Sequence, residues 1–447
     1  MVELIWDNKQ EMLAEINSDI FYQTDKELIP CIEESKNFDN TENLYIEGDN
    51  LDALKLLKKD YENKIKMIYI DPPYNTEKKF MYNDTFRNKK KKECRHSGWL
   101  NMIYPRLKLA RDLLMDDGVI FISIDDNEVE NLKKVCNEIF GAGNFVAEFT
   151  RVTKKAGKST DKIAKNNDYL LCYQKSKAIK LYPFLHDDDG FKFSDEFENE
   201  RGKYKLNQTL DYNTLGYVFS LDYPIAINGN TFYAGGVDEF EYMKRKNDNP
   251  KDGFRWRWSK ELFDFGLANG FVVVKEYDSY SRIYTKTYQN ATIEKNTNGD
   301  YFVDFISRVK PLSSLEFIDN KYSNDNAKKG IDSVLGSNMF DYSKPLSLLQ
   351  CISAFSTREN DIILDFFSGS ATTAHAVMQL NAEDGGNRKF IMVQLPEETD
   401  EKSEAYKAGY KNICEIGKER IRRAGKKIHE DKPDTVFDDG FQVFKIN

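Results

Sequence analysis

The sequence predicts an α/β fold, in which one long, mostly β insertion interrupts a largely parallel sheet. Apolar runs such as 65–70, 119–124 and 362–366 alternate with amphipathic stretches of helical spacing, which is typical of such sheets. The alternation stops near residue 176 and returns near residue 336. Each part alone holds only about three candidate parallel strands, and half a sheet would leave a long unpaired edge. We therefore expect one interrupted domain, with two separate α/β domains as the alternative.

Residues 1–40 are acidic and predict an N-terminal helical arm, and residues 41–175 predict the first half of the α/β domain. In that half, Ile65–Ile70 is β-branched and apolar and therefore predicts a buried strand. The pattern further predicts strands at Leu44–Glu47, Val119–Ile124 and Tyr169–Tyr173. It predicts helices at Leu51–Tyr61, Trp99–Met115 and Val129–Phe140. Asp49 or Asn50 would cap the first of these helices, and Gly118 would end the second.

Residues 176–335 are rich in Tyr, Phe, Asn, Asp and Gly and lack long helical periods, so they predict an irregular insertion of mixed, mostly β structure. The α/β pattern returns in residues 336–427, and a last strand near Phe441–Phe444 lies in the tail of residues 428–447. The expected elements of the second half are helices at Ser343–Phe355, Ala371–Leu380 and Glu404–Lys427 and strands at Ile362–Phe366 and Phe390–Leu395.

The composition is that of a globular protein in a reducing compartment. The chain has 447 residues, of which 40% are hydrophobic and 31% charged, and no run approaches the ~18 apolar residues of a spanning helix. Its N-terminus lacks the basic and then apolar pattern of a signal peptide. The six cysteines include no CxxC pair, and the four histidines have no partners at metal-ligand spacing. We therefore expect reduced thiols, a cytoplasmic protein and no metal site.

The charge is unevenly distributed along the chain. The net charge is −9, and residues 1–60 alone carry 15 acidic and 6 basic side chains, so the rest of the chain sums to zero. Three basic runs stand out: residues 77–95, with Lys89 and Lys90, residues 151–165, with Arg151 and Lys154, and residues 418–427. One such run alone is most often a solvated surface, but local clusters attract a polyanion whatever the total charge.

The segment Asp71-Pro72-Pro73-Tyr74-Asn75-Thr76 follows the predicted strand at 65–70 directly, at the edge of the sheet where ligands bind in open α/β folds. Two consecutive prolines stiffen this loop and lack the N–H groups of a regular ladder. Such a loop can hold a planar ring that bears an amino group. Asp71 and the Pro72 carbonyl accept its two N–H bonds, and Tyr74 stacks on its face. A capped turn is the simpler interpretation of the DPP tripeptide alone.

A second strand–turn–helix motif covers residues 364–373. Its turn, Asp365-Phe366-Phe367-Ser368-Gly369-Ser370, offers a glycine for close backbone approach, followed by the free N–H groups of a helix N-terminus. The motif lacks the further glycines of a pyrophosphate loop, so a smaller ligand with a carboxylate and a ribose fits better. A plain tight turn is the alternative for this motif alone.

Two other patterns are rejected. Gly157-Lys158-Ser159 resembles the end of a phosphate loop, but Val152 stands where the first glycine is needed, so no ATPase is expected. The sequence has no Pro-Cys dipeptide, so a cysteine nucleophile for pyrimidine chemistry has no candidate.

DPPY together with the D-F-F-S-G-S turn resembles the amino-DNA methyltransferases, which transfer a methyl group from S-adenosylmethionine to an exocyclic amine. The order of catalytic motif, insertion and cofactor motif resembles the permuted β group of that family, whose sheet is Rossmann-like. Finer detail resembles the modification (Mod) subunit of Type III restriction-modification systems. The matching segments are Ile46–Leu54, Asp71–Thr76, Trp99–Ala110, Gly118–Asn127, Asp168–Tyr173, Phe340–Leu346, Leu364–Thr373, Lys389–Glu398 and Lys418–Gly425.

The resemblance implies that Lys344, Pro345 and Asp365–Ser370 bind the cofactor, S-adenosylmethionine, with Asp49 and Asn50 nearby. Gln394 stands where many methyltransferases carry an acid for the ribose hydroxyls, and Glu397 and Glu398 follow it. The family also implies double-stranded DNA as substrate, a helicase-nuclease restriction subunit as partner, a homodimer and the bacterial cytoplasm. Longer Mod subunits continue past residues 441–445, close to where this chain stops.

The resemblance further implies methyl transfer to an adenine that is flipped out of the duplex. Accepting both amine hydrogens at Asp71 and the Pro72 carbonyl favours a pyramidal nitrogen whose lone pair points at the methyl group, so Asp71 need not be a strong base. One alternative is transfer to the amine of cytosine, for which Ser is more common at position 71. Another is a DNA-specificity subunit with a silent catalytic site. Protein and RNA methyltransferases usually carry Asn at that position.

The insertion is expected to be the target-recognition domain, since it contains neither motif and concentrates aromatic and basic residues. Within Phe254–Ser259, Arg255 and Arg257 would share one face of a strand while Trp256 and Trp258 anchored the other. Two exposed edge arginines are the simpler alternative. The predicted DNA contacts are Asn75, Thr76, Lys89, Lys90, Arg151, Lys154, Arg255 and Arg257.

Overall fold

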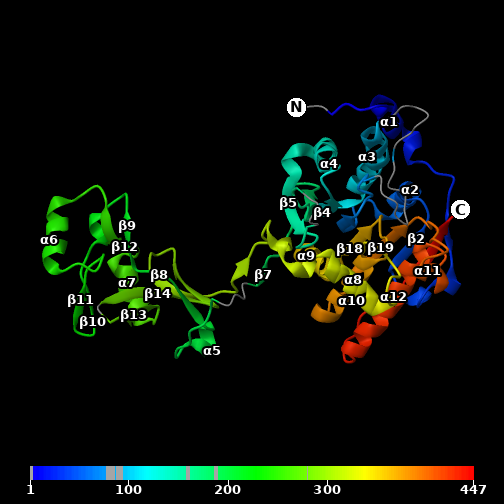
Figure 1. The fold of residues 1–447 in the computed structure, drawn as a ribbon. Coiled ribbons are helices and arrows are strands. Elements are labelled where there is room, and N and C mark those ends of the chain that lie inside the picture. Colours follow the sequence, from blue (N-terminus) through cyan, green and yellow to red (C-terminus); the bar gives the residue numbers. More distant parts are fainter. Residues whose placement is uncertain (1–3, 77–85, 87–93, 158–161, 186–189, 279) are drawn as a thin grey trace. The chain divides into compact units, whose positions relative to one another are not determined.

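The computed structural model describes residues 4–76, 86, 94–157, 162–185, 190–278 and 280–447. The chain divides into two compact units, Met1–Tyr182 with Leu312–Asn447, and Pro183–Pro311 (Figure 1). The second unit contains fewer residues than the expected insertion of residues 176–335. The reason is helix α8 (Asn324–Leu335), whose apolar face shares a core with Ile413 and Ile416 of α12 (Ile413–Asp431) in the first unit.

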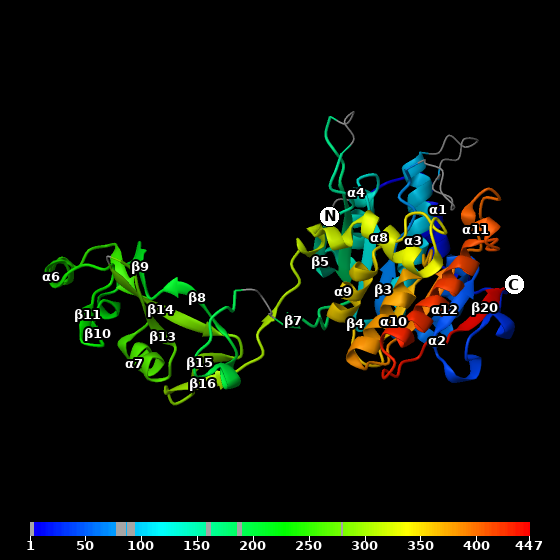
Figure 2. The ribbon, with the colours of Figure 1, turned by 60° about the horizontal axis from the view of Figure 1, so that its bottom comes forward.

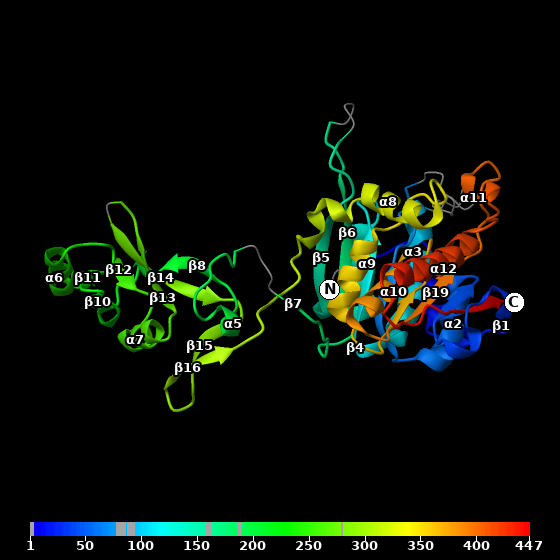
Figure 3. The same ribbon diagram turned by 90° about the horizontal axis from the view of Figure 1, so that it is seen from below.

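A nine-stranded sheet organises the described part of the first unit, and the expected α/β fold is confirmed. In spatial order its strands are β1 (Leu28–Pro30), β20 (Gln442–Ile446), β2 (Leu44–Glu47), β19 (Lys389–Gln394), β18 (Ile362–Asp365), β3 (Ile65–Ile70), β4 (Leu114–Ile124), β6 (Asn167–Gln174) and β5 (Phe145–Val152). The strands from β20 to β4 run parallel, whereas β1, β6 and β5 are antiparallel to their neighbours. Figure 3 shows β5 and β1 at opposite ends of the sheet.

Strands β3 and β18 are hydrogen-bonded neighbours, although the whole insertion separates them in the sequence. Ile362 pairs with Ile65, and Leu364 pairs with Ile68. From β3 the chain continues to β4 on one side, and from β18 it continues to β19 on the other. The sheet therefore has a topological switch point between β3 and β18, and the loops that follow these two strands lie at the same edge.

Helices cover both faces of the sheet (Figure 2). On β3, Ile68 and Ile70 belong to one apolar core, and Met67 and Tyr69 belong to the other, as the two-residue period of a strand requires. The first core contains residues of α1 (Lys9–Ile16), α2 (Asn50–Tyr61), α3 (Arg95–Leu113) and α4 (Val129–Cys136), and the second those of α9 (Leu346–Ser356), α10 (Thr372–Asp384) and α12. Burial on both faces explains why the central strands are mostly apolar; Lys66 of β3 is an exception, and its buried ammonium pairs with Asp117.

Several element ends differ from the sequence-based prediction. Residues 1–40 are only partly helical, because α1 has eight residues and β1 pairs with β20 at the sheet edge. Helix α3 ends at Leu113, and Gly118 lies inside β4. The helix expected at Glu404–Lys427 is divided into α11 (Glu404–Lys407) and α12. Strand β5 has no counterpart in the prediction.

The second unit consists of short strands and small helices, so the expected mixed, mostly β insertion is confirmed. Its described elements are β7 (Phe184–Leu185), α5 (Glu198–Arg201), β8 (Tyr204–Thr209), β9 (Asp211–Thr214), β10 (Ile225–Ile227), β11 (Asn230–Phe232), α6 (Glu239–Asp248), β12 (Gly253–Trp256), α7 (Lys260–Ala268), β13 (Val272–Glu276), β14 (Ser281–Tyr288), β15 (Ala291–Lys295), β16 (Tyr301–Phe305) and β17 (Val309–Lys310). Leu210, Trp256, Phe263 and Ile283 form its main core. In either unit, no helix within the described ranges has the length and apolar character that a bilayer crossing requires.

Candidate active site

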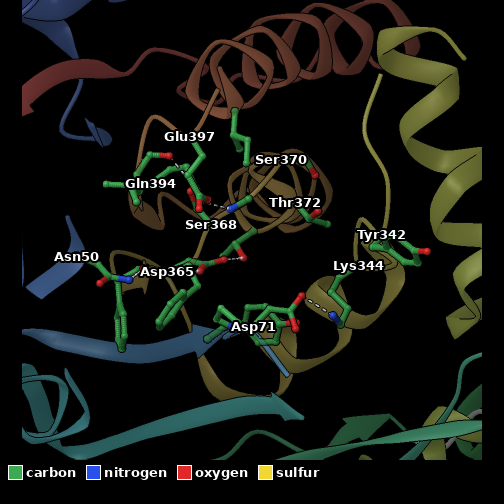
Figure 4. Close-up of a pocket in the computed structure, with 18 of the residues that line it drawn as sticks. Asn50, Asp71, Tyr342, Lys344, Asp365, Ser368, Ser370, Thr372, Gln394 and Glu397 are labelled. Atoms are coloured by element: carbon green, nitrogen blue, oxygen red, sulfur yellow. Dashed lines mark hydrogen bonds and ion pairs between the residues drawn. The ribbon is translucent and has the colours of Figure 1, made fainter. Parts of the chain in front are cut away.

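A cavity of about 260 Å³ lies at the carboxyl edge of the sheet, where the loops after β2, β3, β18 and β19 meet. Figure 4 shows residues of both sequence motifs around it. The predicted site residues in its lining are Asp49, Asn50, Asp71, Pro73, Lys344, Asp365, Phe366, Phe367, Ser368, Gly369, Ser370 and Gln394. Pro72, Tyr74 and Pro345 are outside this lining. Pro72 is buried, and Pro345 is the N-cap of α9.

Asp365 organises the turn after β18. This buried carboxylate accepts the N–H of Phe367 at 3.1 Å and the hydroxyl of Thr373 at 2.6 Å. Gly369 has a φ of 51°, in the left-handed region that favours glycine, and its N–H donates to Gln394 Oε1 at 2.7 Å. Burial raises the pKa of Asp365 to about 7. A positively charged ligand in the cavity would favour its ionised form.

Asp49 and Asn50 belong to the N-terminus of α2. Asn50 Nδ2 donates to the Phe366 carbonyl at 2.7 Å, and Asp49 caps the helix by accepting the N–H of Leu51 at 2.8 Å. Arg106 of α3 binds both residues, with its Nε on Asn50 Oδ1 and its Nη2 3.1 Å from Asp49 Oδ2. Arg106 also lines the cavity. The sequence patterns do not single it out, although it lies within the matching segment 99–110.

Arg420 of α12 is a second cation at the site, and the sequence marks it only as part of the basic run 418–427 and of the matching segment 418–425. Its Nη1 lies 3.0 Å from Ser343 Oγ, 2.9 Å from Ser370 Oγ and 2.6 Å from Thr372 Oγ1. Arg420 is fully buried and has no acidic partner within the described part of the chain. Burial lowers its pKa to about 9. Arg420 therefore connects the turn after β18 to the segment that precedes α9.

The DPPYN loop is held on both sides of Tyr74. The buried indole of Trp99 donates to the Pro73 carbonyl at 2.7 Å. Asn75 has a φ of 57°, and its Nδ2 donates to Glu128 Oε1 at 2.6 Å. Trp99 and Glu128 thus fix the loop; Trp99 begins the matching segment 99–110, whereas no sequence motif marks Glu128.

Lys344 connects the two motifs. Its ammonium forms an ion pair with Asp71 Oδ2 (Figure 4). The same Nζ lies 5.1 Å from the centre of the Tyr74 ring. The cavity therefore brings an acid and a lysine beside the strand–turn–helix motif, and the ring of Tyr74 lies next to that lysine just outside the lining.

Comparison with known proteins gives the family. A family model described as DNA methylase matches residues 65–421. The chain belongs to this DNA methylase family. Over 91% of its length, the chain is 34% identical to the Type III restriction-modification enzyme StyLTI Mod subunit of Salmonella typhimurium. It is 33% identical, over 87% of its length, to the EcoPI Mod subunit of Escherichia phage P1, and it spans 60% and 63% of the length of these two relatives.

A Type II relative is covered more fully. Over 86% of its length, the chain is 32% identical to the Type II methyltransferase M.KpnI of Klebsiella pneumoniae, and it spans 88% of that protein.

The predicted DNA contacts of the first unit lie in different surroundings. Lys89 and Lys90 are outside the described residues, Thr76 and Lys154 are half-buried, and Asn75 is buried against Glu128. Arg151 is a correction. Its exposed fraction is 2%, its guanidinium pairs with Asp168, and its Nη1 donates to the Tyr322 carbonyl at 2.9 Å. A guanidinium with these partners joins β5, β6 and the segment before α8, and it has no exposed donor for phosphate.

In the second unit, the predicted alternation of arginine and tryptophan side chains around β12 is confirmed. The guanidinium carbons of Arg255 and Arg257 lie 5.2 Å and 4.2 Å from the centre of the Tyr212 ring. Trp256 is buried in the core of this unit, and Trp258 packs against the same core. The two arginines therefore share a face with one tyrosine, opposite the tryptophans.

Proposed function

We propose that the chain transfers the methyl group of S-adenosylmethionine to the exocyclic amine of a flipped-out adenine at specific sites in double-stranded DNA. One observation carries the proposal: Asp71 after β3 and the Asp365–Ser370 turn after β18 line the same cavity at a switch point of the sheet. Membership of the DNA methylase family and the likeness to Mod subunits support the same reaction.

The donors and acceptors of the cavity fit S-adenosylmethionine. The cofactor carries positive charge, and Asp365 is a buried acid without an ion pair to any described residue. Phe366 and Phe367 offer apolar contact for the nucleoside of the cofactor. Asp49, Asn50 and the turn after β18 would hold the remaining parts of the cofactor. The side chain of Gln394 supports Gly369, so we assign the ribose contact to Glu397, an acid that also lines the cavity. When bound, the cofactor supplies a methyl group on a cationic sulfur.

The DPPY loop would prepare the target amine. Asp71 accepts one N–H of the amine, and the Pro72 carbonyl accepts the other. Within the described residues nothing donates to the Pro72 carbonyl, whereas Trp99 already occupies that of Pro73. Tyr74 supplies a stacking surface for the flipped base. The amine loses its proton only after the nitrogen becomes cationic, so Asp71 acts mainly as an oriented acceptor.

Labelled S-adenosylmethionine tests the proposal directly. The full chain is incubated with duplex DNA, RNA and protein, and the labelled DNA is digested to nucleosides. We expect label in N6-methyladenine from DNA only. Label in N4-methylcytosine would replace adenine by cytosine as the substrate, and site-specific DNA binding without transfer would indicate a silent specificity subunit.

We infer two partners from the Type III relatives: a restriction subunit and a second copy of the chain. The names of these relatives place them in restriction-modification enzymes as Mod subunits. Light scattering of the purified chain should give the mass of a dimer, and a restriction subunit expressed with it should co-purify. A monomeric mass at micromolar concentration would contradict the homodimer.

We propose that the face formed by Tyr212, Arg255 and Arg257 contacts DNA. The side chain of Arg255 has no hydrogen bond or ion pair to a described residue, and Arg257 is exposed. Loss of a base-reading arginine should cost about 1–3 kcal/mol and relax specificity at one position, whereas loss of a phosphate contact should weaken all sites alike. The measurement is methylation of a library of site variants by Arg255→Ala and Arg257→Ala.

A matched control is Lys260→Ala, which removes a surface lysine that pairs with Asp264 in the same unit. The control should behave like the wild type. If the two arginine variants do so as well, this face does not contact the DNA.

A further inference from the structure

The two carboxylate oxygens of Asp71 have different surroundings. Oδ2 carries the ion pair with Lys344. Oδ1 is buried and has no hydrogen-bond partner among the residues that the structure describes. A buried acceptor without a donor is costly, so such an atom marks a place where a ligand donor is expected. The target amine in the proposed reaction brings such a donor.

The ammonium of Lys344 also has a restricted environment. Its side chain is only 11% exposed, against 24% for Asp71, so water screens this ion pair weakly. The ammonium also lies over the Tyr74 ring, at 5.1 Å from the ring centre. Lys344 therefore contacts the acid and the aromatic residue of the DPPY motif together.

The backbone that carries Lys344 is fixed to the cofactor turn. Ser343 Oγ lies 3.2 Å from Ser370 Oγ and 3.1 Å from Thr372 Oγ1, and Arg420 binds all three hydroxyls. Pro345 follows directly and begins α9. Lys344 thus extends from an anchored segment to Asp71 Oδ2, and both residues line the cavity.

We propose that Lys344 is a positioning residue for Asp71: by holding Oδ2, it leaves Oδ1 as the acceptor for the target amine. This inference rests on the proposed methyl transfer and adds a role for a residue that the sequence resemblance assigns to the cofactor. Asp71 and Asp365 line one cavity as two acids, and the ammonium of Lys344 supplies a positive charge to the same cavity.

The test separates positioning from cofactor binding. Lys344→Met removes the cation and keeps much of the side-chain volume, and Lys344→Arg restores a cation. Two quantities are measured: the single-turnover rate of methyl transfer to DNA at saturating cofactor, and the Kd of S-adenosylmethionine by calorimetry. We expect Lys344→Met to lower the rate about 10–100-fold, as is usual for groups that orient a reacting residue, with little change in Kd. Lys344→Arg should recover much of the rate.

A matched control is Lys328→Met, which removes an exposed lysine of α8 that pairs with Asp332. It should retain the wild-type rate, and thermal melting checks that each variant is folded. A Kd that weakens while the saturated rate stays at the wild-type value would overturn the proposal and assign Lys344 to the cofactor. An unchanged rate and an unchanged Kd would overturn it as well. If the wild-type chain itself transfers no methyl group to DNA, the proposed function fails first, and this inference fails with it.

Discussion

Replacing Asp71 with alanine is expected to lower methyl transfer at least about 100-fold, because the target amine loses an oriented acceptor at the reacting atom. The fold should persist, since the Asp71 side chain lies at the cavity and only Lys344 pairs with it among the described residues. Binding of S-adenosylmethionine should persist too, because the turn after β18 keeps its own hydrogen bonds. The measurements are labelled methyl transfer, calorimetry with the cofactor and thermal melting.

Asp71→Asn is the matched control for this prediction. Its amide keeps one carbonyl oxygen that can accept the amine N–H, but it loses the charge that attracts Lys344. We therefore expect activity between that of the wild type and that of Asp71→Ala. Activity of Asp71→Ala above a few per cent of wild type would remove Asp71 from the assigned role, and a loss of cofactor binding would place it in the cofactor site instead.

The central sheet and its two loops follow from local features of the sequence. Ile65–Ile70 and Ile362–Asp365 are mostly apolar on both faces because helices cover both faces, so each appears as an apolar run in which Lys66 and the terminal Asp365 are the exceptions. Each run ends at a motif rich in Pro, Gly or Ser, which marks the carboxyl end of the strand. Two loops that must act on one reaction have to share an edge, and the parallel pairing of β3 with β18 meets this requirement.

Elements that depend on distant partners are not visible in the same way. Strand β5 carries Glu148 and Arg151, which interrupt its apolar pattern, and its partner β6 lies beyond a basic segment. Strand β1 has only three residues, and it is a strand because β20, from the other end of the chain, pairs with it. Such pairings depend on tertiary contacts that neither propensity nor periodicity records.

The residues that support the site are not evident from the sequence, for a related reason. Arg106 and Arg420 lie on helices, where single polar residues at helical spacing are most often surface side chains, and an aromatic residue on a helix, such as Trp99, is most often a core side chain. Their role depends on what the fold places opposite them: Asn50, the Pro73 carbonyl and a cluster of hydroxyls. The motifs therefore predict which loops form the site, and the structure is needed to identify the groups that fix those loops.

At Arg151, the sequence-based prediction and the structure differ most clearly. In the sequence it opens a basic run and suggests a phosphate contact, but in the structure it pairs with Asp168, which is 4% exposed. Removing one partner of a buried pair leaves an uncompensated charge, so Arg151→Met should lower the free energy of unfolding by about 3–5 kcal/mol. Urea unfolding followed by circular dichroism measures this change.

Two further variants make this expectation specific to the ion pair. Arg151→Met combined with Asp168→Leu removes both charges and should recover much of the lost stability, because no buried carboxylate is left alone. Lys154→Met, in the same basic run, should leave stability close to that of the wild type, because no ion pair of Lys154 is found among the described residues. If Arg151→Met is as stable as the wild type but binds DNA more weakly at every site, the basic run is a phosphate contact after all, and the burial of Arg151 does not persist in solution.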